Sequence, residues 1–390
     1  SERGTADDPD EGEPDVRGGE LVGHALAGRF PVVRFIGRGG MGAVYEVSGP
    51  SGPAAAKVIS LRGRGDKSAA RRFVREATAA SKIESDNVTT TLELGQDDEI
   101  GAPFLLMELL RGSDLAQVLR EAAPLRADVV VSIGLQAARG LAAAHAQGII
   151  HRDLKPANLF LHAPDDGVVT VKVCDFGIAK LTEEQRPADA SDLTKSGGLV
   201  GSPLYMSPEQ TQSARDLDGR TDVWGLCASL YEAISGRRLW EDHESLGEII
   251  VAICTKPVAP LARVAPWVSA DAASIIEKGL RIDRAQRWPT MQALADALSA
   301  IDPGARPISV ADLSAVPDAE RRIEKASTAT ITRAETLTEL PRARRRARRS
   351  LLLVVAGVTA VAATAAVAAT AARQRGPADA AATSSGVEPS

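Results

Sequence analysis

Ten residues in the middle of the chain, HRDLKPANLF (151–160), combine the side chains that phosphoryl transfer requires. Asp153 and Asn158 lie five positions apart, and the aspartate of a DFG sequence, Asp175, follows 22 residues after Asp153. Carboxylate and amide oxygens are ligands that Mg²⁺ accepts beside phosphate oxygens, so we expect Asn158 and Asp175 to bind Mg²⁺. Asp153 then remains free to accept a substrate proton as catalytic base, and Lys155 can stabilise the transferring phosphoryl group.

A glycine-rich stretch near the start of the chain, IGRGGMGAV (36–44), has the spacing GxGxxG. Dinucleotide-binding folds use the same spacing, but there the glycines open a helix. Here they lead into AVYEV, whose residues favour a strand, so the pattern indicates a strand-turn-strand flap over phosphates. Glycine is expected because a Cβ atom would keep the backbone N–H groups from closing on phosphate oxygens.

Lys57 interrupts the apolar run AAAKVI (54–59). A lysine in a half-buried strand is costly unless it has a counter-charge. The helix-like segment RRFVREATAASKI (71–83) supplies Glu76, and we expect an ion pair that directs the ammonium group toward nucleotide phosphates. The alternative is two unrelated surface charges.

The stretch FLLMELLRGSDL (104–115) is an apolar strand followed at once by a polar turn. Such a segment can join two lobes and present backbone groups of Glu108 and Leu110 to a nucleotide base. A plain connecting strand explains the pattern nearly as well.

Composition limits the class of protein. Of 390 residues, 44% are apolar and 3% aromatic, so a sizeable core built from Leu, Val, Ile and Ala is expected. Three cysteines without CxxC spacing argue against a disulfide framework or a zinc site, and they indicate a reducing compartment. Because the chain does not begin with methionine, we expect it to be processed or trimmed, and its first residues lack the pattern of a signal peptide.

The pattern of apolar residues predicts an α+β, bilobal fold. Short strands separated by glycine turns come first, and runs such as PTMQALADALSAI then space apolar residues as helices do. The acidic stretch 1–26 lacks apolar periodicity and is expected to be disordered. The predicted globular domain is 27–302, with an N-lobe at 27–107, a hinge at 108–112 and a C-lobe at 113–302.

The end of the chain resembles a membrane anchor. Residues 303–350 read as a flexible linker that closes with six arginines between Arg342 and Arg349. Residues 351–372 carry no charge, and as a helix these 22 residues would measure about 33 Å, close to the roughly 30 Å hydrocarbon layer of a bilayer. Arginines before the segment predict that the domain is cytoplasmic and that 373–390 is a short extracytoplasmic tail. A buried alanine-rich helix is the alternative.

These motifs, in this order, resemble those of eukaryotic-like (Hanks-type) serine/threonine protein kinases, and with the membrane segment they are similar to the bacterial transmembrane branch. The matching sequences are GRGGMGAV, AAAK, HRDLKPAN, DFG, SPE (207–209), DVW (222–224) and DRAQRW, within roughly seventy per cent of the chain. The resemblance implies ATP contacts at Ile36, Gly37, Arg38, Gly39, Gly40, Met41, Gly42, Ala43, Val44, Lys57 and Glu76. It also implies a structural Glu209–Arg287 ion pair and a helix-anchoring Asp222.

Regulation is expected at Arg152, because an arginine before the catalytic aspartate can hold a phosphorylated loop through charge-assisted hydrogen bonds. Thr194 and Ser196 lie eight and six residues before Ser202, a spacing similar to autophosphorylation sites of the bacterial family. We hypothesise that one or both are autophosphorylated. His145, in AAAHAQG, is interpreted as a packed helix residue without a ligand.

The sequence therefore predicts a single-pass kinase of the inner (plasma) membrane that uses ATP and Mg²⁺. Its expected partners are proteins with Ser or Thr acceptors and anionic lipid headgroups, with no nucleic acid. Small-residue spacings in the apolar segment are compatible with a dimer, although so much alanine produces them by chance. A catalytically silent pseudokinase adaptor and a small-molecule phosphotransferase are the alternative functions. The sequence does not identify the substrates or the activating signal.

Overall fold

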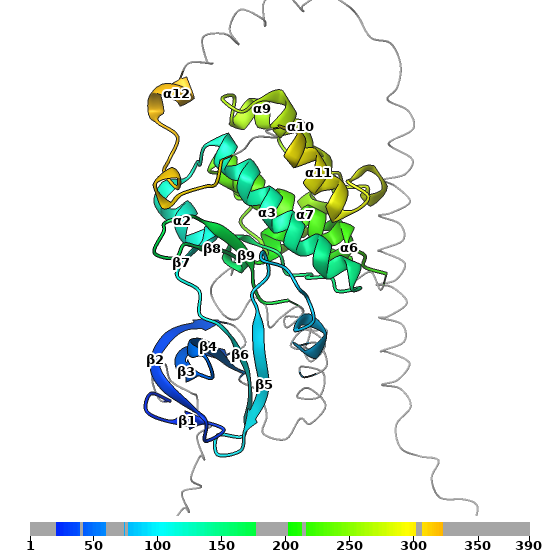
Figure 1. Ribbon diagram of the computed structural model, residues 1–390. Helices are drawn as coiled ribbons and strands as arrows, with labels where there is room; N and C mark the ends of the chain where they lie inside the picture. The colour runs from blue at the N-terminus through cyan, green and yellow to red at the C-terminus, as the bar shows by residue number, and fades with distance from the viewer. Residues whose placement is uncertain are drawn as a thin grey trace, which may run out of the picture. The chain divides into compact units, whose positions relative to one another are not determined.

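The computed structural model describes residues 21–39, 42–59, 74, 77–176, 202–212, 216–301 and 306–322. All of them lie in the first of the two units into which the chain divides, Ser1–Ala326 and Ser327–Ser390. Within this unit, a strand-rich N-terminal lobe precedes a helical C-terminal lobe (Figure 1).

The N-terminal lobe is a six-stranded sheet in which every neighbouring pair is antiparallel, in the order β1-β2-β3-β4-β6-β5. Short turns join β1 to β2 and β3 to β4, as the glycine-separated apolar runs predict. One face of the sheet covers a core in which Tyr45, Phe104 and Leu106 are fully buried. The strands are β1 (Ala25–Leu26), β2 (Phe30–Gly39), β3 (Gly42–Gly49), β4 (Gly52–Ile59), β5 (Thr91–Asp97) and β6 (Ala102–Glu108).

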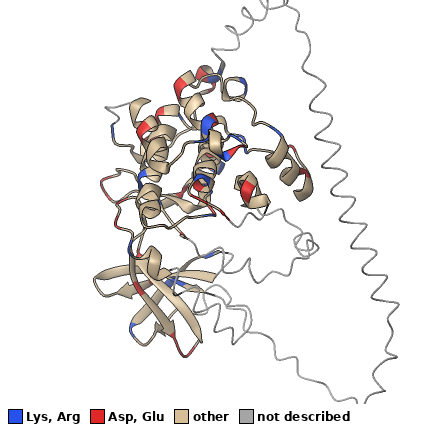
Figure 2. Cartoon of the chain, turned by 90° about the vertical axis from the view of Figure 1, so that its right-hand side faces the viewer, with Lys and Arg blue, Asp and Glu red and all other residues tan. Residues whose placement is uncertain are grey.

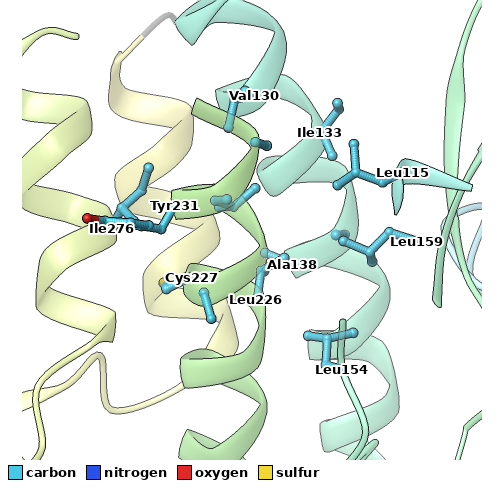
Figure 3. Close-up of a cluster of buried hydrophobic side chains, with 14 of the residues drawn as sticks. Leu115, Val130, Ile133, Ala138, Leu154, Leu159, Leu226, Cys227, Tyr231 and Ile276 are labelled. Atoms are coloured by element: carbon cyan, nitrogen blue, oxygen red, sulfur yellow. The ribbon is translucent and has the colours of Figure 1, made fainter. Parts of the chain in front are cut away.

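The C-terminal lobe is built around two long helices, α3 (Ala127–Ala146) and α7 (Arg220–Ser235), and a small three-stranded sheet, β7-β8-β9. Their apolar side chains meet in one core, part of which Figure 3 shows between Ile133, Leu226 and Ile276. The other elements of the C-terminal lobe are β7 (Gly112–Asp114), β8 (Leu159–His162), β9 (Thr170–Val173), α2 (Leu115–Ala122), α6 (Pro208–Thr211), α8 (Leu246–Thr255), α9 (Leu261–Val264), α10 (Ala270–Gly279), α11 (Met291–Ile301) and the 3₁₀ turns η1 (Pro156–Asn158), η2 (Ser202–Tyr205) and η3 (Arg284–Gln286).

Charged side chains of both signs are interspersed over the helices of this lobe (Figure 2). Near the start of α7, Asp218 pairs with Arg220 at 2.6 Å, and Asp216 pairs with Arg284 at the same distance. Since these groups are at least partly exposed, such pairs contribute little to stability.

Among the described residues, α3 is the one helix that is long and apolar enough to cross a membrane. More than half of its most apolar stretch is buried inside the lobe, where it packs against α7 and α11, so it is a core helix. The predicted membrane segment, 351–372, lies outside the described residues.

Part of the predicted flexible linker is instead folded onto the C-terminal lobe. Residues 306–322, here called the strap, contain η4 (Val310–Asp312) and α12 (Asp318–Arg322). The Val169 N–H donates to the Ile308 carbonyl at 2.8 Å, and the Val316 N–H donates to the Pro124 carbonyl at 2.8 Å. Ile308 and Val316 are 3% and 2% exposed. The compositional boundary at residue 302 missed this segment because its two buried residues are isolated among polar and proline residues.

Candidate active site

The described part of the glycine-rich stretch lies at the end of β2 and the start of β3, where Gly39 pairs with Gly42. The physical reason for glycine at position 42 differs from our expectation. A Cβ atom on Gly42 would lie 1.9 Å from the carbonyl oxygen of Val58 on β4, and the φ angle of Gly42 is +152°. Backbone packing within the sheet therefore excludes a side chain at position 42, whether or not a phosphate binds nearby. A Cβ atom on Gly37 would meet nothing within 4 Å, so the space around it is open. Gly40 and Met41 lie outside the described residues.

Lys57 lies on β4 between Val44 of β3 and Leu105 of β6, which leaves it 5% exposed. Its Nζ atom contacts Oδ1 of Asp175 at 2.6 Å, so the lysine of the N-terminal lobe reaches the aspartate of the C-terminal lobe. This contact supplies the counter-charge that a buried ammonium group requires. The predicted partner Glu76 lies outside the described residues.

Asp175 sits in strained backbone at the junction of the lobes. Its φ angle is +63°, a left-handed conformation that is uncommon for residues other than glycine. Desolvation by the surrounding chain raises the pKa of its carboxyl group, but the charge and hydrogen bond of Lys57 outweigh it, and the pKa lies below its ordinary value. Because 40% of the side chain stays exposed, this ionised carboxylate can receive a cation from solvent.

The loop that carries Asp153 is tied together by its own side chains. Lys155 Nζ contacts Oδ2 of Asp153 at 2.7 Å, and Asn158 Nδ2 donates to the Asp153 carbonyl at 2.7 Å. The Asn158 side-chain oxygen accepts no hydrogen bond from the described residues. His151 Nε2 donates to the Cys174 carbonyl at 2.8 Å, while its Nδ1 accepts from the Asp153 N–H at 3.3 Å. These contacts fix the loop against the residue that precedes Asp175.

Asp222, on the first turn of α7, has a fully buried side chain that accepts hydrogen bonds from the backbone of this loop. Oδ2 accepts the His151 N–H and Oδ1 the Arg152 N–H, each at 2.8 Å. The second bond stabilises Arg152, whose φ angle of +67° is left-handed. His145 Nε2 lies 2.7 Å from Oδ2 of Asp222, so this histidine is a polar partner of the anchor as well as a packed helix residue.

The predicted hinge separates the two sheets, because β6 ends at Glu108 and β7 begins at Gly112. The Glu108 N–H is already used, since it donates to the Thr90 carbonyl at 3.0 Å. The Leu110 N–H has no hydrogen-bond partner within the described part of the chain. Of the two predicted base contacts, Leu110 thus offers a donor, whereas the N–H of Glu108 is used within the N-terminal lobe.

This arrangement can be compared with known proteins. A family model described as the protein kinase domain matches residues 30–298, well over half of the chain. The chain belongs to the protein kinase family.

Similar proteins place the kinase domain in the bacterial eukaryotic-like serine/threonine branch. The chain is 38% identical over 280 residues to the serine/threonine-protein kinase Pkn1 of Myxococcus xanthus, covering 71% of this chain and 39% of that protein. It is 31% identical over 291 residues to the serine/threonine-protein kinase PknA of Mycobacterium tuberculosis, covering 73% and 64%. The crystal structure of the PknI kinase domain of Mycobacterium tuberculosis superposes with a TM-score of 0.55 at 27% identity, covering 72% of this chain and 98% of that domain. The chain thus spans less than two thirds of either curated relative.

A buried ion pair stabilises the kinase domain behind the catalytic loop. Arg287 donates from Nη1 and Nη2 to the two oxygens of Glu209 at 2.7 and 2.8 Å. Desolvation raises the pKa of Glu209, but Arg287 outweighs it, so the pKa lies below its ordinary value. The next residue, Gln210, donates to the Arg152 carbonyl at 2.6 Å, which connects this pair to the catalytic loop.

The sequence analysis did not predict that three residues near the candidate site would form hydrogen bonds or ion pairs with the residues of this site: His145, Lys172 and Gln210. Each finds its partner far along the chain, at separations of 77, 64 and 58 residues. A weak signal existed for Lys172, because a lysine between valines in TVKV is costly to bury without a counter-charge, as it was for Lys57.

Proposed function

We propose that the chain is an ATP-dependent serine/threonine protein kinase that transfers the γ-phosphoryl group of ATP to Ser and Thr hydroxyls of proteins. The observation that carries this proposal is a continuous set of contacts joining the predicted site residues. Lys57 pairs with Asp175 at 2.6 Å, and the Cys174 N–H beside it donates to the Asn158 carbonyl at 2.9 Å. These contacts connect the residues proposed to bind phosphate with the proposed catalytic loop, which supports a single site across the lobes.

The donor set fits ATP and Mg²⁺. Asp175 offers an ionised, partly exposed carboxylate, and Asn158 offers a side-chain oxygen that accepts no hydrogen bond from the described residues. Such hard oxygen ligands suit Mg²⁺, which when bound neutralises charge on the triphosphate. The turn of β2 and β3 and the ammonium of Lys57 would then receive the phosphates, and the Leu110 N–H would receive the base.

Asp153 is positioned to accept the proton of the attacking hydroxyl. Its backbone is held by Asn158, and one carboxylate oxygen contacts Lys155 at 2.7 Å. The ammonium of Lys155 can stabilise negative charge on the transferring phosphoryl group while Asp153 orients the hydroxyl. Both side chains remain partly exposed, at 29% for Asp153 and 23% for Lys155, so a substrate can reach them.

Phosphate incorporation from labelled ATP in the presence of Mg²⁺ tests the proposal, with the full chain beside its Asp153→Asn variant. We expect incorporation by the unaltered protein and a loss of about 100-fold or more in the variant, since the amide cannot take the proton. ATP binding by both proteins without any incorporation would reject the kinase proposal in favour of a pseudokinase adaptor.

We further infer that phosphorylation of Thr194 or Ser196 activates the kinase through Arg152. Both acceptors lie outside the described residues, but Arg152 Nε is buried and has no partner among the described ones. A phosphate group would satisfy this donor with a charge-assisted hydrogen bond. If a variant with both Thr194→Ala and Ser196→Ala kept full activity toward a generic substrate, this mechanism would be wrong.

We also propose that residues 351–372 anchor the kinase as a single span in the inner (plasma) membrane. Support comes from the sequence: 22 uncharged residues follow an arginine run that favours the cytoplasmic side. The full chain is expected in the membrane fraction after alkaline washing, and a chain ending at residue 341 in the supernatant. Recovery of both in the supernatant would refute the anchor.

A further inference from the structure

A partly buried ion pair links the hinge to strand β9. Lys172 Nζ contacts Oε1 of Glu108 at 2.8 Å, with side chains 11% and 26% exposed. The Thr90 N–H donates to the same Oε1 at 2.7 Å, and the Glu108 N–H donates back to the Thr90 carbonyl. Desolvation raises the pKa of Glu108, but Lys172 and Thr90 outweigh it, and the pKa is lowered. The first residue of the hinge is thus held by backbone and side chain together.

The far end of the hinge is also held by the C-terminal lobe. The Arg111 N–H donates to His162 Nδ1 at 2.9 Å, and its guanidinium contacts Asp165 at 3.0 Å. A Cβ atom on Gly112 would lie 2.2 Å from the Leu161 carbonyl oxygen, so the backbone runs directly against β8. Between these two attachments lies Leu110, whose N–H has no partner within the described part of the chain.

Strand β9 connects this attachment to the phosphate end of the site. It carries Lys172 and ends at Val173, two residues before Asp175. Val173 is itself bonded to the N-terminal lobe, since its N–H donates to the Asn87 carbonyl at 2.9 Å and its carbonyl accepts the Thr89 N–H at 3.1 Å. The one strand therefore sets the position of the hinge and of the aspartate that pairs with Lys57.

We propose that Lys172 is a positioning residue for the nucleotide, acting through Glu108. The ion pair holds the hinge backbone in place before the base arrives, so that the Leu110 N–H is offered without a further ordering cost. The inference rests on the proposed function, because it concerns binding of ATP at this same site. Lys172 has no direct role toward the phosphates, which distinguishes it from Lys57.

Four variants of the full chain test this assignment. Lys172→Met keeps the length of the side chain and removes its charge, whereas Lys172→Arg keeps the charge. Glu108→Gln keeps an oxygen for the Thr90 N–H. The double variant Glu108→Gln/Lys172→Met leaves no buried charge without a partner, so it stays folded where Lys172→Met alone is weakened by an unpaired carboxylate. Arg237→Met, which breaks an exposed pair with Glu241, is the control.

The measurements are the Kd of a fluorescent ATP analogue, the KM for ATP, kcat and Tm. We expect Lys172→Met and the double variant to raise Kd and KM about three- to tenfold with kcat changed less than about twofold. Lys172→Arg is expected to stay within about twofold of the unaltered protein, and the control to remain unchanged.

The inference is overturned if Tm falls in the Lys172 variants while Kd and KM do not move, because the lysine is then only structural. It is equally overturned if the control raises Kd to the same extent. Kd is measured without turnover, so a chain that binds the analogue but transfers no phosphate rejects the proposed kinase activity and still tests Lys172. A chain that does not bind the analogue at all rejects both.

Discussion

The substitution Asp222→Asn would remove one hydrogen bond that holds the backbone of the proposed catalytic loop. Asp222 accepts three hydrogen bonds, two at Oδ2 and one at Oδ1, whereas an amide nitrogen accepts none. The amide orientation of lower free energy places this nitrogen at the Oδ1 site, because only the Arg152 N–H then loses its acceptor. The opposite orientation would remove the two hydrogen bonds at Oδ2. One hydrogen bond to a charged group contributes about 1.5–3 kcal/mol.

The same change releases a strained residue next to the proposed catalytic base, Asp153. Arg152 holds a left-handed φ of +67° opposite Oδ1, and without that acceptor it can relax toward ordinary backbone angles. Asp153 follows directly in the chain and would move with it. A displacement of about 1 Å in a reacting group can reduce the rate roughly 100-fold, so we expect kcat to fall about 10- to 100-fold.

Thermal unfolding followed by circular dichroism, beside phosphate incorporation at saturating ATP, measures both effects. The expected stability loss corresponds to a Tm lower by about 3–5 °C for a domain of this size. Asp218→Asn is the matched control, because its pair with Arg220 is partly exposed and worth roughly 0–1 kcal/mol. Full activity in Asp222→Asn, or a Tm no lower than that of the control, would refute the reasoning.

Two further predictions concern the C-terminal lobe. The pKa of Glu209 is lowered in the folded state, so between the two pKa values the folded state binds fewer protons than the unfolded state. The ionised Glu209 therefore contributes its full stabilisation above the ordinary pKa of 4.5, and this stabilisation is lost as pH falls through the folded-state pKa. Urea titrations of the unaltered protein and Glu209→Gln should therefore differ in free energy of unfolding near neutral pH and converge in acid; a constant difference would contradict the assignment. Ending the chain at residue 302 removes two strap residues that are 3% and 2% exposed, so we expect a Tm several degrees lower than for a chain ending at residue 326. Equal Tm values would show that the strap contributes no net stability.

The two halves of the fold were predictable from local patterns. Glycine-separated apolar runs predicted strands β2, β3 and β4, and a helical period predicted α11. The strap was missed because Ile308 and Val316 become buried only against Pro124, Val169 and their neighbours. Its burial depends on a surface that another part of the chain provides.

The sequence by itself determined the chemistry available to this protein, because phosphoryl transfer demands particular side chains. Asp153, Asn158 and Asp175 could be predicted as site residues from residue type, spacing and order alone. Only the tertiary structure decided which pairs of side chains support the segments around them. Lys172 meets Glu108 across 64 residues, and His145 meets Asp222 across 77. By charge alone, Lys172 and His145 could each have paired with any carboxylate. The packing of β9 against the hinge and of α3 against α7 brings them to Glu108 and Asp222.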